Sequence, residues 1–486
     1  MNIEVLINVT PQETRVAFVE NGVLQEVAIE RTRNRGIVGN IYLGKVCRVL
    51  PGMEAAFVEI GLDRAAFLHA SDVIPDGQNG VEMDEPVSIN RLLHEGQQLL
   101  VQVVKDPLGT KGARLTTHVT IPSRYLVLMP YGGSIGVSTR IEDGAERERL
   151  RQLVYKARGD RPQGYILRTA AEGVSEQDLL QDMAFLDRVW SKISEREKSS
   201  APGACVYSDL PLAKRTLRDM VGSDCTQLLI DSRGTYSDVL EFAESYVPEM
   251  VDRLQLYTGE RPIFDLYNIE DEILKALERK VMLKSGGHLI FDQTESMTTI
   301  DVNTGGFVGS RNLEETIFKT NLEAAQTIAR QLRLRNLGGI IIIDFIDMSD
   351  PEHRRSVMRA LEKALEKDHA RSQVCDVSPL GLVEMTRKRT RESLEHVLCE
   401  PCGVCKGKGY VKTAETACYD LFREILREAR QYDASEILLL VSQEIVDLLL
   451  DEESSSLAEL QQFIDIPIKY QVETQYYQDQ FDVVPI

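Results

Sequence analysis

Hydrophobic and polar positions along the chain predict two neighbouring strands that each end on an acidic residue. One apolar run leads into Asp301, and a second run at positions 340–343 leads into Asp344. Between them, apolar residues recur at helical spacing and predict a long helix that begins near Asn312 and ends before Gly338. A strand, a crossover helix and a parallel strand usually become neighbours in one sheet, so we expect Asp301 and Asp344 to meet at one sheet end.

Short strands separated by turns dominate the first part of the chain. Residues 1–35 read as two or three strands, and residues 36–118 show the short, turn-separated strands that are typical of a small barrel. Residues 119–205 mix strands with two charged helices, one of which is predicted to begin after a serine cap at Ser175. The remaining segments carry α/β patterns interrupted by one cysteine-rich stretch: residues 206–276, 277–398, 399–413 and 414–486.

Length and composition change this picture only in part. With 486 residues, 43% of them hydrophobic, the chain should hold several domains with buried cores. No apolar run approaches the length of a membrane span, and no signal peptide is visible, so we expect a cytoplasmic protein. The net charge of −20 is unusual for a nucleic-acid-binding protein, although local basic patches occur at positions 31–35, 333–335 and 387–391.

The two strand-end aspartates predict a magnesium site. Mg²⁺ takes oxygen ligands and usually only one or two protein carboxylates, a number that Asp301 and Asp344 supply. Asn303 lies two residues after Asp301, on the same strand face, and can orient a ligand or a phosphate. Asp292 and Asp347 are weaker candidates, and alternation along the strand predicts that Asp347 faces away from Asp344. The alternative is that these aspartates only cap strand ends.

The histidines favour metal chemistry over acid–base chemistry. A nuclease that works without a metal needs a general base and a general acid, which are usually histidines. The seven histidines of this chain are scattered, and no two are close in sequence.

The eight cysteines include a cluster that predicts a zinc site. Cys402 and Cys405 are separated by two residues and flanked by glycines, a spacing that lets two thiolates bind one Zn²⁺. A structural zinc needs four ligands, so the same pair from a second copy of the chain could complete the site, or Cys399 could add a third ligand. The alternative is a reduced loop without metal. A redox role is less expected, because no strand leads into a helix at this pair.

Two aromatic residues of the predicted barrel are candidate contacts for single-stranded nucleic acid. Phe57 and Phe67 lie on short strands, with Lys45 and Lys111 nearby in the pattern. Exposed aromatic rings on such a face stack on single-stranded bases, and lysines follow the phosphates. Periodicity does not decide between this role and a place for both rings in the barrel core.

Together these segments resemble the ribonuclease E/G family of bacterial endoribonucleases over essentially the whole chain. The resemblance rests on sequence stretches at residues 111–117, 285–287, 299–303, 321–325, 330–335 and 344–348 and on the Cys402/Cys405 pair. One departure is Gly403, which stands where the family frequently has proline.

The resemblance implies a mosaic of α/β domains, with a zinc link between the catalytic part and a small C-terminal domain. The implied domains are an RNase H-like domain formed by 1–35 and 206–276, an S1-type OB-fold at 36–118, a 5′-sensor domain at 119–205, a DNase I-like catalytic domain at 277–398, the zinc link at 399–413 and a small α/β domain at 414–486.

The resemblance also implies an activity and its cofactors. Asp301 and Asp344 would bind catalytic Mg²⁺ with support from Asn303, and Cys402 and Cys405 would share a structural Zn²⁺ with a partner subunit. The implied RNA contacts are Phe57, Phe67 and Lys111, with Arg168 and Thr169 as a pocket for a 5′-monophosphate. The expected enzyme cleaves single-stranded RNA to 3′-hydroxyl and 5′-phosphate ends, matures the 5′ end of 16S rRNA and takes part in mRNA decay.

We expect a homodimer or a homotetramer. The sequence leaves two rival functions: an RNA-binding ribosome-assembly factor without catalysis, and a metal-dependent nuclease for DNA.

Overall fold

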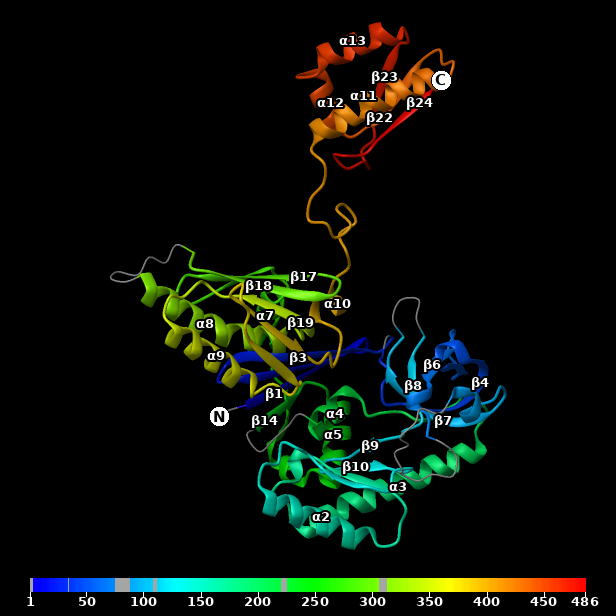
Figure 1. Ribbon diagram of the computed structural model, residues 1–486, viewed down its shortest axis with the longest axis vertical. Coiled ribbons are helices and arrows are strands. Elements are labelled where there is room, and N and C mark those ends of the chain that lie inside the picture. The colour runs from blue at the N-terminus through cyan, green and yellow to red at the C-terminus, as the bar shows by residue number, and fades with distance from the viewer. Residues whose placement is uncertain (1–2, 34, 75–87, 108–111, 220–224, 306–312) are drawn as a thin grey trace. The chain divides into compact units, whose positions relative to one another are not determined.

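Residues 3–33, 35–74, 88–107, 112–219, 225–305 and 313–486 are described by the computed structural model shown in Figure 1. The chain divides into two compact units, Met1–Val397 and Leu398–Ile486. Among the described residues, the first unit holds four sheets and the second holds one, so the predicted mixed α/β architecture with several domains is confirmed. No helix within the described ranges is long and apolar enough to cross a membrane.

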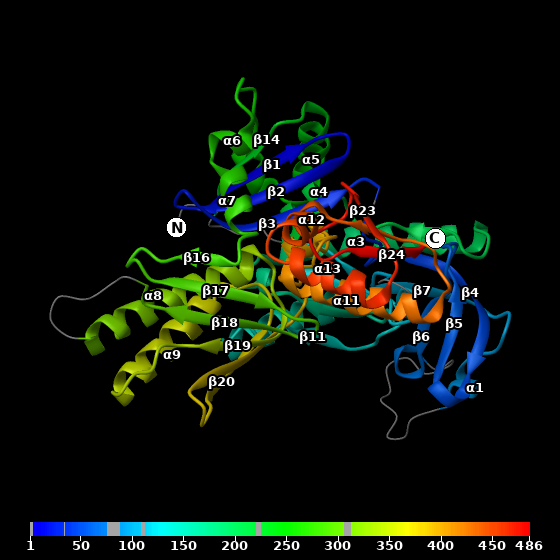
Figure 2. The ribbon, with the colours of Figure 1, turned by 90° about the horizontal axis from the view of Figure 1, so that it is seen from above.

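The first sheet combines strands from two distant parts of the sequence. Its five strands run in the order β15-β14-β1-β2-β3, and β1 pairs in parallel with β14 (Figure 2). The strands are β1 (Ile3–Val9), β2 (Glu13–Glu20), β3 (Val23–Arg31), β14 (Cys225–Ile230) and β15 (Leu254–Leu256), and helices α4 (Leu212–Asp219), α5 (Arg233–Tyr246), α6 (Ile263–Leu266) and α7 (Ile269–Lys275) accompany them. Val5 and Ile7 of β1 and Val239 of α5 are fully buried in the shared core.

A polar cluster closes the ends of the two parallel strands in this first sheet. Asn8 is the residue of β1 that comes directly after the last pair with β14. Its Nδ2 donates to Oδ2 of Asp231, just beyond β14, at 2.6 Å. Arg15 of β2 donates from Nη2 to Oδ1 of Asn8 at 2.7 Å and contacts Glu270 at 2.8 Å. A guanidinium therefore lies among the acidic groups at this sheet end.

The second sheet curls into the small barrel that the sequence predicts. Its strand order is β13-β4-β5-β6-β8-β7, and an additional pairing between β4 and β7 closes it. The elements are β4 (Ile41–Leu50), β5 (Ala55–Glu59), β6 (Ala66–His69), α1 (Ile89–Leu92), β7 (Gln98–Lys105), β8 (Arg114–Thr116) and β13 (Cys205–Tyr207). Gly44 permits tight packing inside, because a Cβ there would lie 2.6 Å from Cγ1 of Val58.

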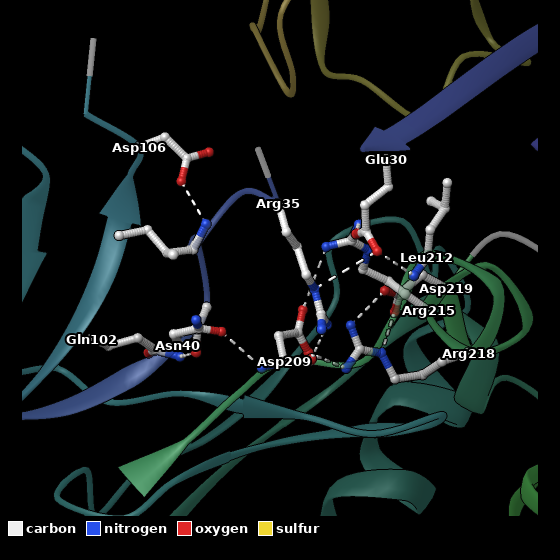
Figure 3. A network of polar contacts seen from close by, with 12 residues as sticks. Glu30, Arg35, Asn40, Gln102, Asp106, Asp209, Leu212, Arg215, Arg218 and Asp219 are labelled. Atoms are coloured by element: carbon white, nitrogen blue, oxygen red, sulfur yellow. Dashed lines mark hydrogen bonds and ion pairs between the residues drawn. The ribbon is translucent and has the colours of Figure 1, made fainter. Parts of the chain in front are cut away.

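Polar contacts fasten the segment that leads from β3 into the barrel (Figure 3). The backbone N–H of Ile37 donates to Asp106 at 2.7 Å, and the backbone N–H of Asp209 donates to Asn40 at 2.9 Å. Asp209 also accepts from Arg218, whose side chain is buried between the carboxylates of Asp209 and Asp219 at 3.0 and 2.7 Å. Burial opposes the charge of Arg218, but these carboxylates outweigh it and raise its pKa.

The third sheet has the order β11-β12-β10-β9 and is accompanied by two helices. The elements are β9 (Ile121–Pro122), β10 (Leu126–Met129), β11 (Ile135–Val137), α2 (Gly144–Arg158), β12 (Gly164–Leu167) and α3 (Glu176–Ser199). The predicted serine cap is confirmed, because Ser175 accepts a hydrogen bond from the backbone N–H of Asp178 at the start of α3.

The fourth sheet carries the strands with aspartate ends. Its order is β16-β17-β18-β19-β21-β20, and α8 and α9 lie together against one face (Figure 1). The elements are β16 (Lys280–Met282), β17 (His288–Gln293), β18 (Met297–Asn303), α8 (Leu313–Leu334), β19 (Gly339–Asp344), α9 (Pro351–Leu365), β20 (Ser372–Val377), β21 (Leu382–Arg387) and α10 (Leu394–Leu398). The predicted apolar stripe of α8 is confirmed, since Ala324, Ile328 and Leu332 are fully buried against the sheet. Asn312, near which the sequence predicts the start of this helix, lies outside the described residues.

The second unit is built around a three-stranded sheet with the order β23-β22-β24. The elements are α11 (Ala414–Gln431), β22 (Ile437–Val441), α12 (Gln443–Leu450), α13 (Ser454–Ile464), β23 (Ile468–Val472) and β24 (Phe481–Pro485). Ile437, Leu439 and Val441 of the central strand are fully buried against α11 and α12.

A buried ion pair fastens the far edge of the fourth sheet. Arg387 of β21 donates to Asp368 from Nε at 2.7 Å and from Nη2 at 3.0 Å, and both side chains are almost fully buried. Removing one member of such a pair leaves a buried charge without its partner.

We therefore predict that Asp368→Ala lowers the free energy of unfolding of this part of the chain by about 3–5 kcal/mol. Glu352→Ala, which breaks the exposed pair with Arg355, should change it by no more than about 0.5–1 kcal/mol. Urea-dependent pulse proteolysis of the full chain measures both variants. Equal effects of the two substitutions would contradict the assignment of a stabilising role to the buried pair.

Candidate active site

Asp301 and Asp344 are direct neighbours across two parallel strands. β18 and β19 pair in parallel, and the register places Asp301 opposite Asp344, which confirms the predicted strand–helix–strand arrangement. Along β18 the residues that flank Asp301, Ile300 and Val302, are buried under the helices, whereas Asp301 is exposed. The two carboxylates therefore lie at the carboxyl end of the strands, on the face that α8 and α9 do not cover.

Asn303 lies on the same strand face as Asp301 and contacts it directly. The Nδ2 group of Asn303 donates to Oδ2 of Asp301 at 2.8 Å. This hydrogen bond holds one carboxylate oxygen and leaves the other oxygen available for a ligand. Asn303 is thus placed to orient the carboxylate.

The electrostatics of this sheet end favour a bound cation. Partial burial raises the pKa of Asp344, and the charges of Asp301 and Asp347 raise it further. Within the described ranges, no group of three or more histidine, cysteine or acidic side chains has the geometry of a metal site. Two carboxylates still fit Mg²⁺, which keeps several waters and phosphate oxygens in its coordination shell.

The weaker candidates, Asp347 and Asp292, have different surroundings. Asp347 lies near enough to Asp344 for its charge to raise the pKa of that carboxyl. Because β19 ends at Asp344, strand alternation does not extend to position 347, and the expectation that Asp347 faces away from Asp344 stays a prediction. Asp292 of β17 accepts from Nη2 of Arg279 at 2.7 Å and is therefore already engaged in an ion pair.

Cys402 and Cys405 form a tight turn whose chemistry suits a thiolate ligand. Backbone N–H groups of Lys406 and Lys408 donate to the carbonyls of Cys402 and Cys405 at 2.7 and 2.9 Å. Backbone N–H groups of Gly409 and Gly407 then lower the pKa of the Cys405 thiol, and Cys402 contributes to the same effect. All eight cysteines lie within the described residues and are free thiols.

Comparison with known proteins identifies the family. The model of the Ribonuclease E/G family matches residues 120–390, which include the two facing aspartates. The chain belongs to the ribonuclease E/G family. A second model of this family, described as RNase E/G, Thioredoxin-like domain, matches residues 401–486.

Curated members of the family align with the whole chain. Ribonuclease G of Salmonella typhimurium is 58% identical over 489 residues, and ribonuclease G of Escherichia coli is 57% identical over 488 residues, each covering 100% of both chains. Ribonuclease E of Escherichia coli is 37% identical over 459 residues, which cover 93% of this chain and 43% of that protein.

In this member of the family, Phe57 and Phe67 are cross-strand partners on the outer face of the barrel. Their ring centroids lie 6.3 Å apart in an edge-to-face arrangement, and both rings are half-buried, whereas the alternate residues Val58 and Leu68 fill the core. Arg48 and Arg114 lie directly opposite them on the adjoining strands, and Lys45 is exposed. The predicted RNA contact Lys111 lies outside the described residues.

Arg168 and Thr169 lie at the end of β12, where the sequence gives them no distinctive pattern. Nη1 of Arg168 is 2.8 Å from Oδ1 of Asp219 and donates to the carbonyl of Ser123 at 2.6 Å. Asp219 also accepts from Arg218, as the labelled side chains in Figure 3 show. The hydroxyl of Thr169 lies 3.0 Å from that of Ser138, which follows β11, so the two neighbouring residues contact different partners at the end of β12.

Sequence reasoning gave no role to the polar residues of α8 that lie nearest the facing aspartates. Asn321 is fully buried and contacts the backbone of Ile346, between Asp344 and Asp347. The available signal was an amide side chain within an otherwise apolar helical stripe, which is costly to bury without partners.

Proposed function

We propose that this chain is a Mg²⁺-dependent endoribonuclease that cleaves single-stranded RNA and leaves 3′-hydroxyl and 5′-phosphate ends. The observation that carries the proposal is the register that sets Asp301 opposite Asp344 in a chain of the ribonuclease E/G family. The aligned relatives named ribonuclease G and ribonuclease E support the choice of RNA as the substrate.

Asp301 and Asp344 would hold the Mg²⁺ ion, and Asn303 would keep the Asp301 carboxylate in place through its 2.8 Å hydrogen bond. When bound, Mg²⁺ supplies a Lewis acid that activates water and offsets the charge on the reacting phosphate. The carboxylates are exposed on the helix-free face of the sheet, which leaves room for an RNA backbone.

The barrel would bind the single-stranded substrate. The half-buried rings of Phe57 and Phe67 offer faces for base stacking, and Lys111 would contact a phosphate. Arg48 lies opposite Phe57, and its guanidinium matches the negative backbone, whereas the guanidinium of Arg114 pairs with Asp72 at 2.8 Å.

A 5′-monophosphate would bind at Arg168 and Thr169 and stimulate cleavage. A guanidinium and a hydroxyl at one strand end can donate several hydrogen bonds to a terminal phosphate. The substrates that we propose are precursors of 16S rRNA, whose 5′ end is matured, and mRNA that enters decay.

The zinc site would join subunits. Cys402 and Cys405 supply two of the four ligands that a structural Zn²⁺ requires, and a partner subunit would supply the same pair. We propose a cytoplasmic homodimer, which can pair further into a homotetramer. Residues 399–413 would act as the zinc link between a DNase I-like domain at 277–398 and a C-terminal domain at 414–486.

The remaining domain assignments are also part of this proposal. Strands from residues 3–31 and 225–256 share the first sheet, which supports a discontinuous RNase H-like domain made of 1–35 and 206–276. The closed sheet supports an S1-type OB-fold at 36–118, and the sheet flanked by α2 and α3 supports a 5′-sensor domain at 119–205.

Asp301→Asn should reduce cleavage of a defined single-stranded RNA by at least about 100-fold, because even partners behind a metal ligand contribute 10–100-fold. RNA binding, measured by fluorescence anisotropy, should remain within about twofold of the unsubstituted protein. End-group analysis of the products, with and without Mg²⁺, checks the chemistry. Absence of cleavage by the unsubstituted protein, with RNA binding retained, would favour the ribosome-assembly role. Full activity of Asp301→Asn would contradict the assigned role of Asp301, and equal cleavage of the matching single-stranded DNA would favour a DNA nuclease.

RNA with a 5′-monophosphate should be cleaved about tenfold faster than the same RNA with a 5′-triphosphate, since a charged hydrogen bond contributes about 1.5–3 kcal/mol. Arg168→Ala should bring that ratio close to one. Arg151→Ala, which removes an exposed guanidinium of α2, is the matched control and should leave the ratio unchanged. Equal cleavage rates for the two RNAs with the unsubstituted enzyme would contradict the proposal that this site senses the 5′ end.

Removal of zinc with a chelator, or Cys402→Ser, should convert the assembly to smaller species in sedimentation velocity, because two thiolates cannot fill a four-ligand site. Cys375→Ser changes an exposed thiol of β20 and should leave the sedimentation coefficient unaltered. If chelator and Cys402→Ser both leave the assembly size unchanged, zinc does not join the subunits.

A further inference from the structure

One helix contacts the backbone on both sides of the facing aspartates. Three polar side chains of α8 accept or donate hydrogen bonds to loops at the carboxyl end of the fourth sheet. Glu314 accepts from the backbone N–H groups of Ser349 and Asp350 at 3.0 and 3.2 Å. The other two side chains are Asn321 and Glu323, and neither has a part in the proposed chemistry.

Asn321 holds one residue of the loop through both of its backbone groups. Its Nδ2 donates to the carbonyl of Ile346 at 2.7 Å, and its Oδ1 accepts from the N–H of Ile346 at 3.1 Å. The side-chain amide has the same donor and acceptor as a peptide group, so it pairs with Ile346 as a neighbouring strand would. Asn321 is fully buried, which excludes water as a substitute partner.

This pairing begins where the sheet ladder stops. The backbone register of β19 ends at Asp344, which lies opposite both Asp301 and Leu382. Ile346 comes two residues later and precedes Asp347, whose charge reaches Asp344. Asn321 therefore fixes the segment that follows Asp344 and leads into Asp347 after regular strand pairing has ended.

Glu323 secures the other strand in a comparable way. Its carboxylate accepts from the backbone N–H of Ser285 at 3.0 Å and from that of Lys284. The turn that contains these residues packs closely on the end of β18, because a Cβ at Gly287 would lie 2.6 Å from the carbonyl of Asn303. One turn of α8 thus supports the loops next to both Asp301 and Asp344.

We propose that Asn321 is a positioning residue for the cation site. Its two hydrogen bonds to Ile346 set the separation of the acidic side chains and thereby the affinity for Mg²⁺. The inference rests on the proposed function, since it assumes that Asp301 and Asp344 hold the ion. Asn321 does not touch RNA or metal and acts only through the 345–347 backbone. Phe345 and Met348, both buried, keep the segment attached when the amide is lost, so a change in the acidic groups is separable from unfolding.

The test compares Asn321→Ala with Gln331→Ala in the full chain. Gln331 is a matched control, because it is a buried amide on the same helix whose hydrogen bond goes to Arg335, away from the aspartates. Binding of Mn²⁺ as a Mg²⁺ substitute is measured by electron paramagnetic resonance without RNA, and Asp344→Asn defines binding at other sites. Amide hydrogen exchange of the peptide that covers residues 345–350 reports whether the hydrogen bonds between Asn321 and Ile346 are lost.

Asn321→Ala should raise the dissociation constant for Mn²⁺ about tenfold and speed amide exchange at Ile346, as for groups that orient metal ligands. Gln331→Ala should lower the melting temperature while leaving the Mn²⁺ affinity within about twofold of the parent. If Asn321→Ala does not fold, Asn321→Ser serves in its place.

Unchanged Mn²⁺ affinity in a folded Asn321 variant, or an equal loss in Gln331→Ala, would overturn the inference. The proposed function would survive that result as long as Asp301→Asn still abolishes cleavage and Mn²⁺ binding. Retained Mn²⁺ binding in Asp301→Asn and Asp344→Asn would instead overturn the function and the inference together.

Discussion

The arrangement of the candidate active site depends on the parallel register of β18 and β19. Ile300 and Val302 on one strand and Ile341 and Ile343 on the other are buried under α8 and α9, and their alternation fixes which residues face the opposite side. A slip of one residue would bury an aspartate and expose an isoleucine. The apolar core therefore holds two carboxylates next to each other despite their mutual repulsion.

Acidic groups lie at the ends of two pairs of parallel strands, and the charged side chains around them differ. At the end of β1 and β14, Arg15 brings its own positive charge to Asn8, Glu270 and the neighbouring Asp231. At the end of β18 and β19, no ion pair to Asp344 is present within the described part of the chain. Among the described residues, the first sheet end therefore contains its own positive charge, whereas no cationic side chain pairs with Asp344 at the second, which is the end that we propose binds a cation.

Local patterns predicted the fold where neighbouring elements pack on each other. The apolar runs before Asp301 and Asp344, the helix between them, the serine cap at Ser175 and the closed barrel all follow from spacing within short windows. Patterns of this kind could not reveal the pairing of β1 with β14, because more than two hundred residues separate the strands. The same limit applies to the partner of Arg168, since nothing in its sequence neighbourhood points to Asp219. Strand alternation also does not decide the direction of Asp347, because this residue lies beyond the last paired residue of β19.

The contact between Asn40 and Asp209 has a consequence for how this chain could have been assembled. The polypeptide leaves the first sheet after β3 and returns to it at α4, and these two crossing points are hydrogen-bonded to each other. The two ends of the inserted part, which comprises the barrel and the third sheet, thus lie together, an arrangement that tolerates insertion. Exchange of this part would leave the strands of the first sheet intact but would remove partners such as Arg168, which pairs with Asp219 of α4.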